Sequence, residues 1–202
     1  THRVPLMGGW GREAGGSDCI ENALVSRLIH NRVCVCNMSI PAPLDLFTAT
    51  VKPAWIDHNK HMNMGFYLVV FDLATDEFMK FVRLTRAHRK THNVTTFSLE
   101  GHITYNREIG EGEPMRFTTQ LLDFDAKRLH YIHHMYHGTE GYLAATNELM
   151  SLHVSEVTRR AAPMEPAILE RLAAIKTAHG ALPPNPYTGR LIGLKSRATT
   201  NS

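Results

Sequence analysis

Hydrophobic and polar positions follow two different periods along this 202-residue chain. Residues 47–56 alternate with β-branched residues and predict a strand. Residues 64–82 repeat apolar side chains every three or four positions, while Asp72, Asp76 and Lys80 recur on another side, which predicts a helix of about five turns. The first half of this helix is apolar on nearly every side, so we expect other structure to surround it.

The second half of the chain has the pattern of an antiparallel meander. Four strand-like runs are separated by short turns rich in Gly, Asp and Pro, and they cover residues 95–107, 115–124, 128–136 and 142–154. A last helix is predicted from Pro166 to about Gly180, followed by an irregular tail. The order of elements predicts an α+β fold, in which one curved antiparallel sheet wraps around a long central helix.

Three segments are expected from this pattern. Residues 1–44 carry glycine clusters without a long apolar stripe and predict a poorly ordered N-terminal extension. Residues 45–160 hold the sheet and the long helix, with a basic linker at 83–90. Residues 161–202 supply the C-terminal helix and the tail. Because a single curled sheet has little to cover its back, we expect a homodimer or a dimer of dimers, with each site shared across the interface.

Composition narrows the possible partners. The chain is 43% hydrophobic and 20% charged, which is typical of a globular protein. A net charge of +3 without a Lys/Arg run argues against nucleic acid as a partner. No apolar run approaches the ~20 residues that span a bilayer, so no membrane partner is expected. Cys19, Cys34 and Cys36 form a poor disulfide framework and predict reduced thiols in a cytoplasmic protein.

The densest chemistry lies just before the long helix. Residues 57–63 contain a carboxylate, two imidazoles and two carboxamides within seven positions. A helix N-terminus offers free N–H groups and a partial positive charge, so an acid beside it can attack or hydrate an activated carbonyl. An ordinary turn would use the same residue types, with Asp57 and Asn59 as turn formers and Asn63 as the N-cap.

The arrangement resembles the hotdog-fold acyl-CoA thioesterases of the 4-hydroxybenzoyl-CoA thioesterase-like branch. That family carries an Asp four residues before a His-hydrophobe-Asn triplet, at the positions of Asp57 and His61-Met62-Asn63. The chain is most similar to the betainyl-CoA thioesterases, including those fused to carnitine dehydrogenases. The matching segments are residues 55–63, 71–76, 99–105, 120–130 and 160–163.

The resemblance implies metal-independent hydrolysis of a small acyl-CoA to the free acid and CoA. It implies Asp57 as general base or nucleophile, two roles that the sequence does not separate. The backbone N–H groups of Met64 and Gly65 are expected to stabilise the oxyanion. His61 and Asn63 are assigned to orienting the loop or the substrate. No metal and no cofactor are expected, since CoA is part of the substrate.

Further residues are candidates for substrate binding. A quaternary ammonium would favour an aromatic cage, for which Tyr67, Phe71, Tyr105 and Trp55 are candidate walls, although core packing explains each equally well. Glu100 and His102 share one face of their strand with Thr104, where they line the cavity or simply face solvent. Lys127 and Arg128 at a hairpin are candidates for the CoA phosphates.

One departure from the family pattern concerns Lys60, which stands where that pattern usually has Gly. If the position needs positive φ, a lysine strains the turn. Alternatively, its amine reaches a phosphate.

Two other functions are set against hydrolysis. A non-catalytic hotdog protein would bind acyl-CoA as a sensor or subunit, with Lys60 as its support. A hotdog dehydratase would use a His–acid pair, which the segment before the helix resembles less well. The histidines at 130, 133, 134 and 137 are dense, but alternation sends them to opposite faces of a strand, which weakens a metal site there.

Overall fold

A computed structural model describes residues 39–194 of the chain. The five strands are β1 (Leu44–Thr50), β2 (Val94–Tyr105), β3 (Pro114–Phe124), β4 (Arg128–His137) and β5 (Leu143–Ser155). The helices are α1 (Met64–Phe81), α2 (Arg86–His92) and α3 (Pro166–His179), with a short 3-10 helix, η1, at Pro53–Trp55. Most of the predicted N-terminal extension lies outside the described residues.

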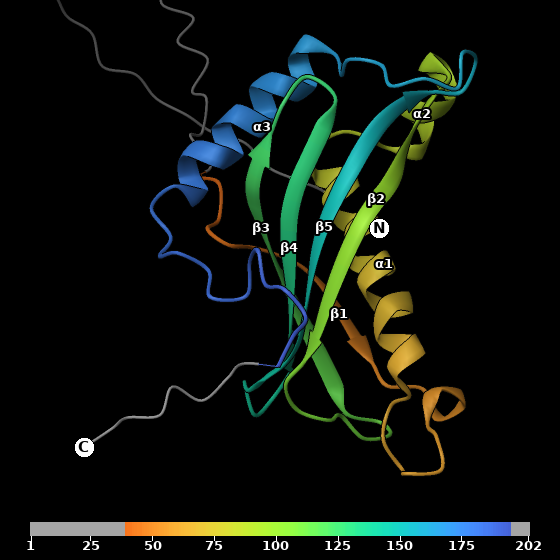
Figure 1. The fold of residues 1–202 in the computed structure, drawn as a ribbon, viewed down its shortest axis with the longest axis vertical. Helices are drawn as coiled ribbons and strands as arrows, with labels where there is room; N and C mark the ends of the chain where they lie inside the picture. Colours follow the sequence, from red (N-terminus) through yellow and green to blue (C-terminus); the bar gives the residue numbers. More distant parts are fainter. Residues whose placement is uncertain (1–38, 195–202) are drawn as a thin grey trace, which may run out of the picture. The chain divides into compact units, whose positions relative to one another are not determined.

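The strands form one antiparallel sheet in the order β1-β3-β4-β5-β2. Helix α1 runs along one face of this sheet, and α3 lies beside β3 (Figure 1). Strands β1 and β2 are the two edges. The predicted α+β architecture, with a curved sheet around one long helix, is therefore confirmed. Among residues 39–194, no helix combines the length and apolar character needed to cross a bilayer.

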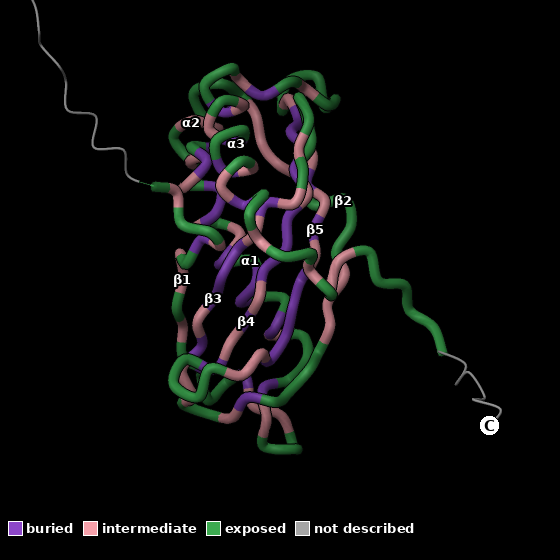
Figure 2. The backbone as a smooth tube through the Cα atoms, turned by 90° about the vertical axis from the view of Figure 1, so that its left-hand side faces the viewer, coloured by how far each residue is buried: buried purple, intermediate pink, exposed green. Residues whose placement is uncertain are grey.

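The core lies between α1 and the sheet. Phe71 and Phe78 of α1 are fully buried, and Phe71 meets Phe117 of β3 edge to face with ring centroids 5.7 Å apart. Figure 2 shows that the buried residues concentrate in the strands, whereas the connecting loops are exposed. Each fully buried phenylalanine contributes roughly 2–3 kcal/mol of apolar burial, which fixes the helix against the sheet.

Two predicted elements differ from the structure. The first strand begins at Leu44 and ends at Thr50, because Pro53 cannot donate a ladder hydrogen bond and instead opens η1. The basic linker contains the seven-residue helix α2, which has no buried residue and therefore no apolar period to detect. Thr85 caps it by accepting a hydrogen bond from the His88 N–H at 3.1 Å.

One side of α1 is exposed, contrary to the expectation that other structure surrounds its first half. Met64, Leu68, Val69 and Leu73 all reach solvent in the single chain. The periodic sequence correctly located the helix, but a helix that is apolar all round needs more cover than one sheet supplies.

The C-terminal helix covers the part of β3 that does not pair with β1. The pairing of β3 with β1 ends at Thr119, and beyond it the Leu121 N–H donates a hydrogen bond to His179 Nδ1 at 2.9 Å. Burial lowers the pKa of His179, so the ring is neutral in this role. The irregular tail then crosses the far face of the sheet, where Asn185 Nδ2 donates to Gln120 Oε1 at 3.1 Å.

His133 links α1 to the middle of the sheet. The ring is fully buried, and it contacts Thr119 Oγ1 through Nδ1 at 2.8 Å and Thr75 Oγ1 through Nε2 at 3.0 Å. Burial lowers the pKa of His133 to about 3, because charging the ring would place a cation in the core. The folded protein therefore holds this histidine neutral at physiological pH.

We expect stability to fall in acid because unfolding releases His133 to be protonated. The lowered folded pKa gives stability that is complete above pH 6.5 and is lost as the pH falls toward 3. Between pH 7.5 and pH 5.0 this residue alone should cost about 2 kcal/mol, measured by urea unfolding. His133→Gln should be less stable at pH 7.5 and should lose less on acidification, whereas exposed His58→Gln should behave as wild type. An unchanged pH dependence in His133→Gln would contradict this account.

Candidate functional site

The segment before α1 is a miniature hairpin. Asp57 N–H donates to the His61 carbonyl at 3.1 Å, and Lys60 N–H donates to the Asp57 carbonyl at 3.0 Å. Ile56 and Met62 face each other as an isolated antiparallel bridge. These bonds enclose a three-residue loop, the type in which a type I turn is followed by a left-handed residue. The predicted active-site segment therefore has a defined backbone.

Lys60 occupies the left-handed position of this loop, with φ of +67°. Glycine adopts this conformation freely, whereas a side chain costs about 1 kcal/mol. The expectation that a lysine strains the turn is confirmed by this backbone angle. The side chain is exposed.

Only one oxygen of the Asp57 carboxylate accepts a hydrogen bond from the described residues. Its Oδ1 accepts a hydrogen bond from the Asn59 N–H at 2.8 Å, which fixes the side chain over the turn. The other oxygen, Oδ2, has no hydrogen-bond partner among residues 39–194. A carboxylate that is held by one oxygen and open at the other has the geometry that a base or a nucleophile needs.

The N-terminus of α1 starts directly after this hairpin. Asn63 is its N-cap, and its Oδ1 accepts a hydrogen bond from the Gly65 N–H at 3.0 Å. Within the described part of the chain, the Met64 N–H has no acceptor. Of the two predicted oxyanion donors, the Gly65 N–H is engaged by the capping contact and the Met64 N–H is free in this structure.

His61 lies at the rim of the same hairpin. Its Nε2 is 3.5 Å from Glu108 Oε1, and both side chains are well exposed. The backbone of His61 bridges to Gly110, and the Ile109 carbonyl accepts from the Met62 N–H at 2.9 Å. The loop after β2 therefore holds the hairpin and orients the imidazole.

The aromatic candidates differ in exposure. Phe71 is fully buried, and Trp55 and Tyr67 are nearly so, whereas 48% of Tyr105 is exposed. Tyr67 meets Tyr105 edge to face, with ring centroids 5.2 Å apart. Burial raises the pKa of Tyr67 to about 12, so its phenol stays protonated. Core packing thus explains three of the four rings, and only Tyr105 presents a ring to a ligand.

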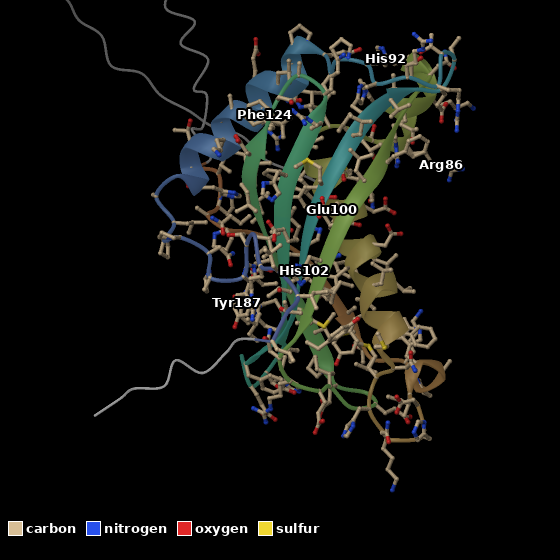
Figure 3. All side chains as sticks on the ribbon, in the orientation of Figure 1. Arg86, His92, Glu100, His102, Phe124 and Tyr187 are labelled. Carbon is tan, nitrogen blue, oxygen red and sulfur yellow. The ribbon has the colours of Figure 1, made fainter. Side chains whose placement is uncertain are left out.

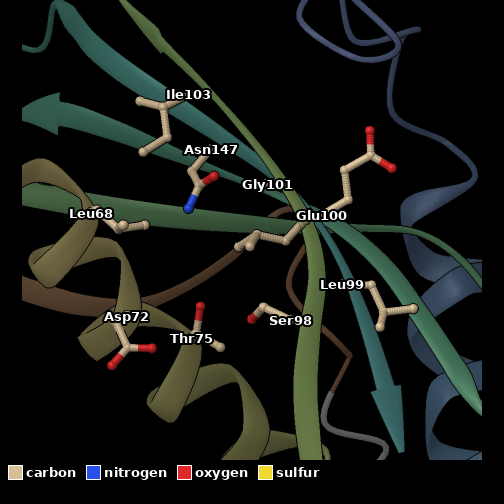
Figure 4. Close-up of a pocket in the computed structure, with 10 residues that line it drawn as sticks. Leu68, Asp72, Thr75, Ser98, Leu99, Glu100, Gly101, Ile103 and Asn147 are labelled. Carbon is tan, nitrogen blue, oxygen red and sulfur yellow. The ribbon is translucent and has the colours of Figure 1, made fainter.

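Glu100 and His102 lie half-way along β2, away from the Asp57 hairpin (Figure 3). In Figure 4 the Glu100 carboxylate points away from Leu68 and Asp72 of α1. His102 lines a shallow pocket on that far face together with His130 and Arg190. A single chain therefore does not bring Glu100 or His102 to Asp57.

Lys127 and Arg128 are also separate from the hairpin. They lie in the turn between β3 and β4, at the opposite end of an 11-residue strand that spans roughly 37 Å. Asp125 Oδ1 accepts from both backbone N–H groups at 2.8 Å, and Asp125 Oδ2 accepts from Arg128 Nε at 2.7 Å. These contacts stabilise the turn and occupy the Arg128 guanidinium.

A groove of about 320 Å³ lies between α1 and the β2 edge (Figure 4). Asp72 and Thr75 line one wall, and Ser98 and Asn147 line the other. Asn147 Oδ1 is buried without a hydrogen-bond partner in the described residues. Asn147 was not predicted as a site residue, because only the strand register places it opposite α1. The predicted alternation of the β4 histidines is confirmed, since His133 and His137 are buried and His130 and His134 lie on the other face.

Comparison with known proteins decides the family. A family model of the thioesterase-like superfamily matches residues 51–172, which include the hairpin, α1 and strands β2 to β5. The chain belongs to this superfamily. The predicted resemblance to hotdog thioesterases is thereby confirmed. A betainyl-CoA thioesterase of Pseudomonas aeruginosa is 40% identical over 75% of this chain and 95% of its own length.

Two further relatives extend the comparison. An L-carnitine dehydrogenase/betainyl-CoA thioesterase of Rhizobium sp. is 32% identical over 76% of this chain, which spans only 31% of that longer protein. A Staphylococcus aureus protein whose structure was solved in complex with CoA superimposes with a TM-score of 0.71 and 27% identity, over 77% of this chain and 98% of that one. The sheet and the central helix are therefore those of a hotdog thioesterase.

The turn geometry predicts that Lys60→Gly stabilises the protein. Relief of the left-handed strain should raise the free energy of unfolding by about 0.5–1 kcal/mol and Tm by about 2–4 °C, measured by thermal and urea unfolding. His58→Gly is the matched control, because His58 has no positive φ and should only lose stability. A Lys60→Gly protein less stable than wild type would contradict the strain, and a weakened CoA affinity would assign the amine to a phosphate.

Proposed function

We propose that this protein is an acyl-CoA thioesterase that hydrolyses a small acyl-CoA to the free acid and CoA. The observation that carries the proposal is the juxtaposition of the open Asp57 oxygen with the unoccupied Met64 N–H at the start of α1. The 40% identical betainyl-CoA thioesterase and the CoA-bound structural relative support the same reaction class.

In the proposed reaction the thioester carbonyl lies over the helix N-terminus. Its oxygen accepts from the Met64 N–H and is further stabilised by the partial positive charge of the helix. Asp57 can attack the carbonyl carbon, so that the C–S bond breaks, CoA leaves as the thiolate and a mixed anhydride forms; water then hydrolyses the anhydride, which regenerates the carboxylate and releases the proton that the thiolate takes up. Alternatively, Asp57 removes a proton from the attacking water. In the second case the same carboxyl then protonates the departing thiolate, which balances the reaction.

The neighbouring side chains position this pair. Asn63 fixes the first turn of α1 and leaves the preceding donor free, and His61 is held by Glu108 at the rim. We assign both residues to orientation of the hairpin and the substrate. The proposed chemistry uses the chain's own groups and no metal.

We propose that the acyl group is betainyl, so that the acid released is betaine. The support is the printed activity of the Pseudomonas aeruginosa relative and of the fused Rhizobium protein. The fusion to an L-carnitine dehydrogenase also supports a place in carnitine metabolism. Tyr105 offers an exposed ring for the quaternary ammonium. The odd set of three cysteines favours a reducing compartment, and we place the enzyme in the cytoplasm.

We further propose a homodimer formed through one continuous apolar surface. This surface, the α1–β2 surface, consists of the exposed apolar residues Met64, Leu68, Val69, Leu73, Leu99 and Tyr105. It follows the free edge of β2, whose unpaired backbone groups can pair with a second copy. Tyr105 OH donates to the Met64 carbonyl at 3.4 Å, so the surface reaches the proposed oxyanion donor.

A charge placed on the α1–β2 surface should separate the subunits. Leu68 and Leu99 are 53% and 56% exposed, so Leu68→Glu or Leu99→Glu should cost a monomer little but should bury an unpaired charge in the dimer. Sedimentation should give twice the 22.7-kDa chain mass for wild type and the chain mass for either variant. Leu191→Glu, on the exposed tail, should remain dimeric. A monomeric wild type at micromolar concentration would contradict the dimer.

The catalytic proposal is tested by thiol release from betainyl-CoA. Asp57→Asn keeps an acceptor for the Asn59 N–H but removes the carboxylate, so kcat should fall at least about 100-fold with folding unchanged. Asp72→Asn tests the other acid near the groove and should change kcat by less than about tenfold. Asp76→Asn, an exposed residue on the same helix, is the control. Loss of activity in Asp72→Asn but not in Asp57→Asn would overturn the assignment.

The substrate and the alternative function are tested in the same assay. The 3,3-dimethylbutyryl thioester of CoA has the shape of betainyl-CoA without its charge, so the expected preference for betainyl-CoA measures recognition of the ammonium. A wild type that binds these thioesters but releases no thiol would instead support a non-catalytic acyl-CoA-binding protein.

A further inference from the structure

Two histidines and a glutamate converge where α2 meets the start of α3. His88 and His92 are four residues apart on α2, so they share one face of the helix, and their rings stack with centroids 4.4 Å apart. Glu165 precedes α3 and contributes its carboxylate from more than 70 positions along the chain. One potential ligand atom from each of the three side chains lies within 4.8 Å of the others.

The distances suit a metal ion of zinc size. His92 Nδ1 is 2.7 Å from Glu165 Oε1, and His88 Nδ1 is 4.0 Å from Glu165 Oε2. Ligand bonds of about 2.0–2.1 Å in a tetrahedral zinc site place neighbouring ligand atoms about 3.3 Å apart. The two observed distances lie on either side of this value, so small side-chain rotations would bring both to it.

Glu165 is directed at the histidines rather than at its own helix. It occupies the N-cap position of α3, where a side chain commonly accepts a backbone N–H, yet it makes no capping hydrogen bond. Both of its carboxylate oxygens instead face α2.

A third imidazole completes the surroundings. His153 of β5 is 98% buried, and its Nδ1 donates to the Ala162 carbonyl at 2.9 Å, which leaves a lone pair on Nε2. That Nε2 is buried without a hydrogen-bond partner in the described residues. Ala162 lies three residues before Glu165, so this contact holds His153 near the segment that carries the carboxylate.

We propose that His88, His92 and Glu165 bind one divalent zinc-class ion, which joins α2 to the start of α3. Two imidazoles and one carboxylate are a known zinc ligand set, and they leave a fourth position that water can fill. The site lies beyond the C-terminal end of α1, while Asp57 lies before its N-terminal end. Because α1 spans 18 residues, or about 27 Å, the ion is a structural clamp and takes no part in hydrolysis.

Metal titration of the full-length protein tests the clamp. After EDTA treatment and dialysis, Zn²⁺ should bind with one ion per chain in calorimetry and raise Tm by about 5–10 °C at 100 times Kd. Mg²⁺, which prefers oxygen ligands, should not raise Tm. Co²⁺ should give the visible ligand-field absorption of a nitrogen and oxygen site, without the charge-transfer band of a thiolate.

Matched variants locate the ion. His92→Ala and Glu165→Gln should each weaken Zn²⁺ binding at least tenfold, whereas the joint Cys34→Ser, Cys36→Ser variant should bind as wild type. His130→Ala is the control for an ordinary His–Glu pair, since His130 Nε2 contacts Glu148 Oε1 at 2.8 Å, and among residues 39–194 no second histidine joins this pair within ligand range. No stoichiometric Zn²⁺ binding by the folded wild type, or binding that persists in both Glu165→Gln and His92→Ala, would overturn the proposal.

Discussion

The backbone bond from the Asn63 N–H to the Trp55 carbonyl, 2.9 Å long, is the constraint on which the candidate site depends. It joins the two ends of the Asp57 hairpin at Asn63, the N-cap of α1, and so fixes the turn to the helix N-terminus. Burial of Phe71 and Phe78 then fixes α1 against the sheet. The Asp57 carboxylate and the Met64 N–H are therefore positioned mainly by main-chain contacts of the candidate site.

A single chain leaves one side of α1 uncovered. A sheet of five strands covers only one side of α1, and the α1–β2 surface remains open along the free β2 edge and up to Met64. Substrate-binding candidates are scattered over the chain: Glu100 and His102 lie mid-strand on the far face, and Lys127 and Arg128 at the distant end. In the dimer that we propose, a second copy supplies a wall along this surface and encloses the candidate site.

The sequence predicted those parts of the molecule that depend on periodicity or on local turn chemistry. The bounds of α1, the meander and α3 followed from hydrophobic spacing and turn signals. A glycine in the family pattern raised a positive φ at Lys60 as one alternative, and the structure has this φ. Helix α2 was missed because it buries no residue and leaves no apolar period. The grouping of His88, His92 and Glu165, and the opposition of Asn147 to α1, depend on tertiary contacts and strand register that no local pattern encodes.

The most direct measurement is a crystal structure of Asp57→Asn with intact betainyl-CoA bound. Our account predicts the thioester carbonyl oxygen about 3 Å from the Met64 N, with the carbonyl carbon facing the substituted side chain and the α1–β2 surface of a second subunit closing the site. A thioester bound instead beside Asp72 in the groove, or on the far face near Glu100, would contradict the assignment of the hairpin as the hydrolytic centre.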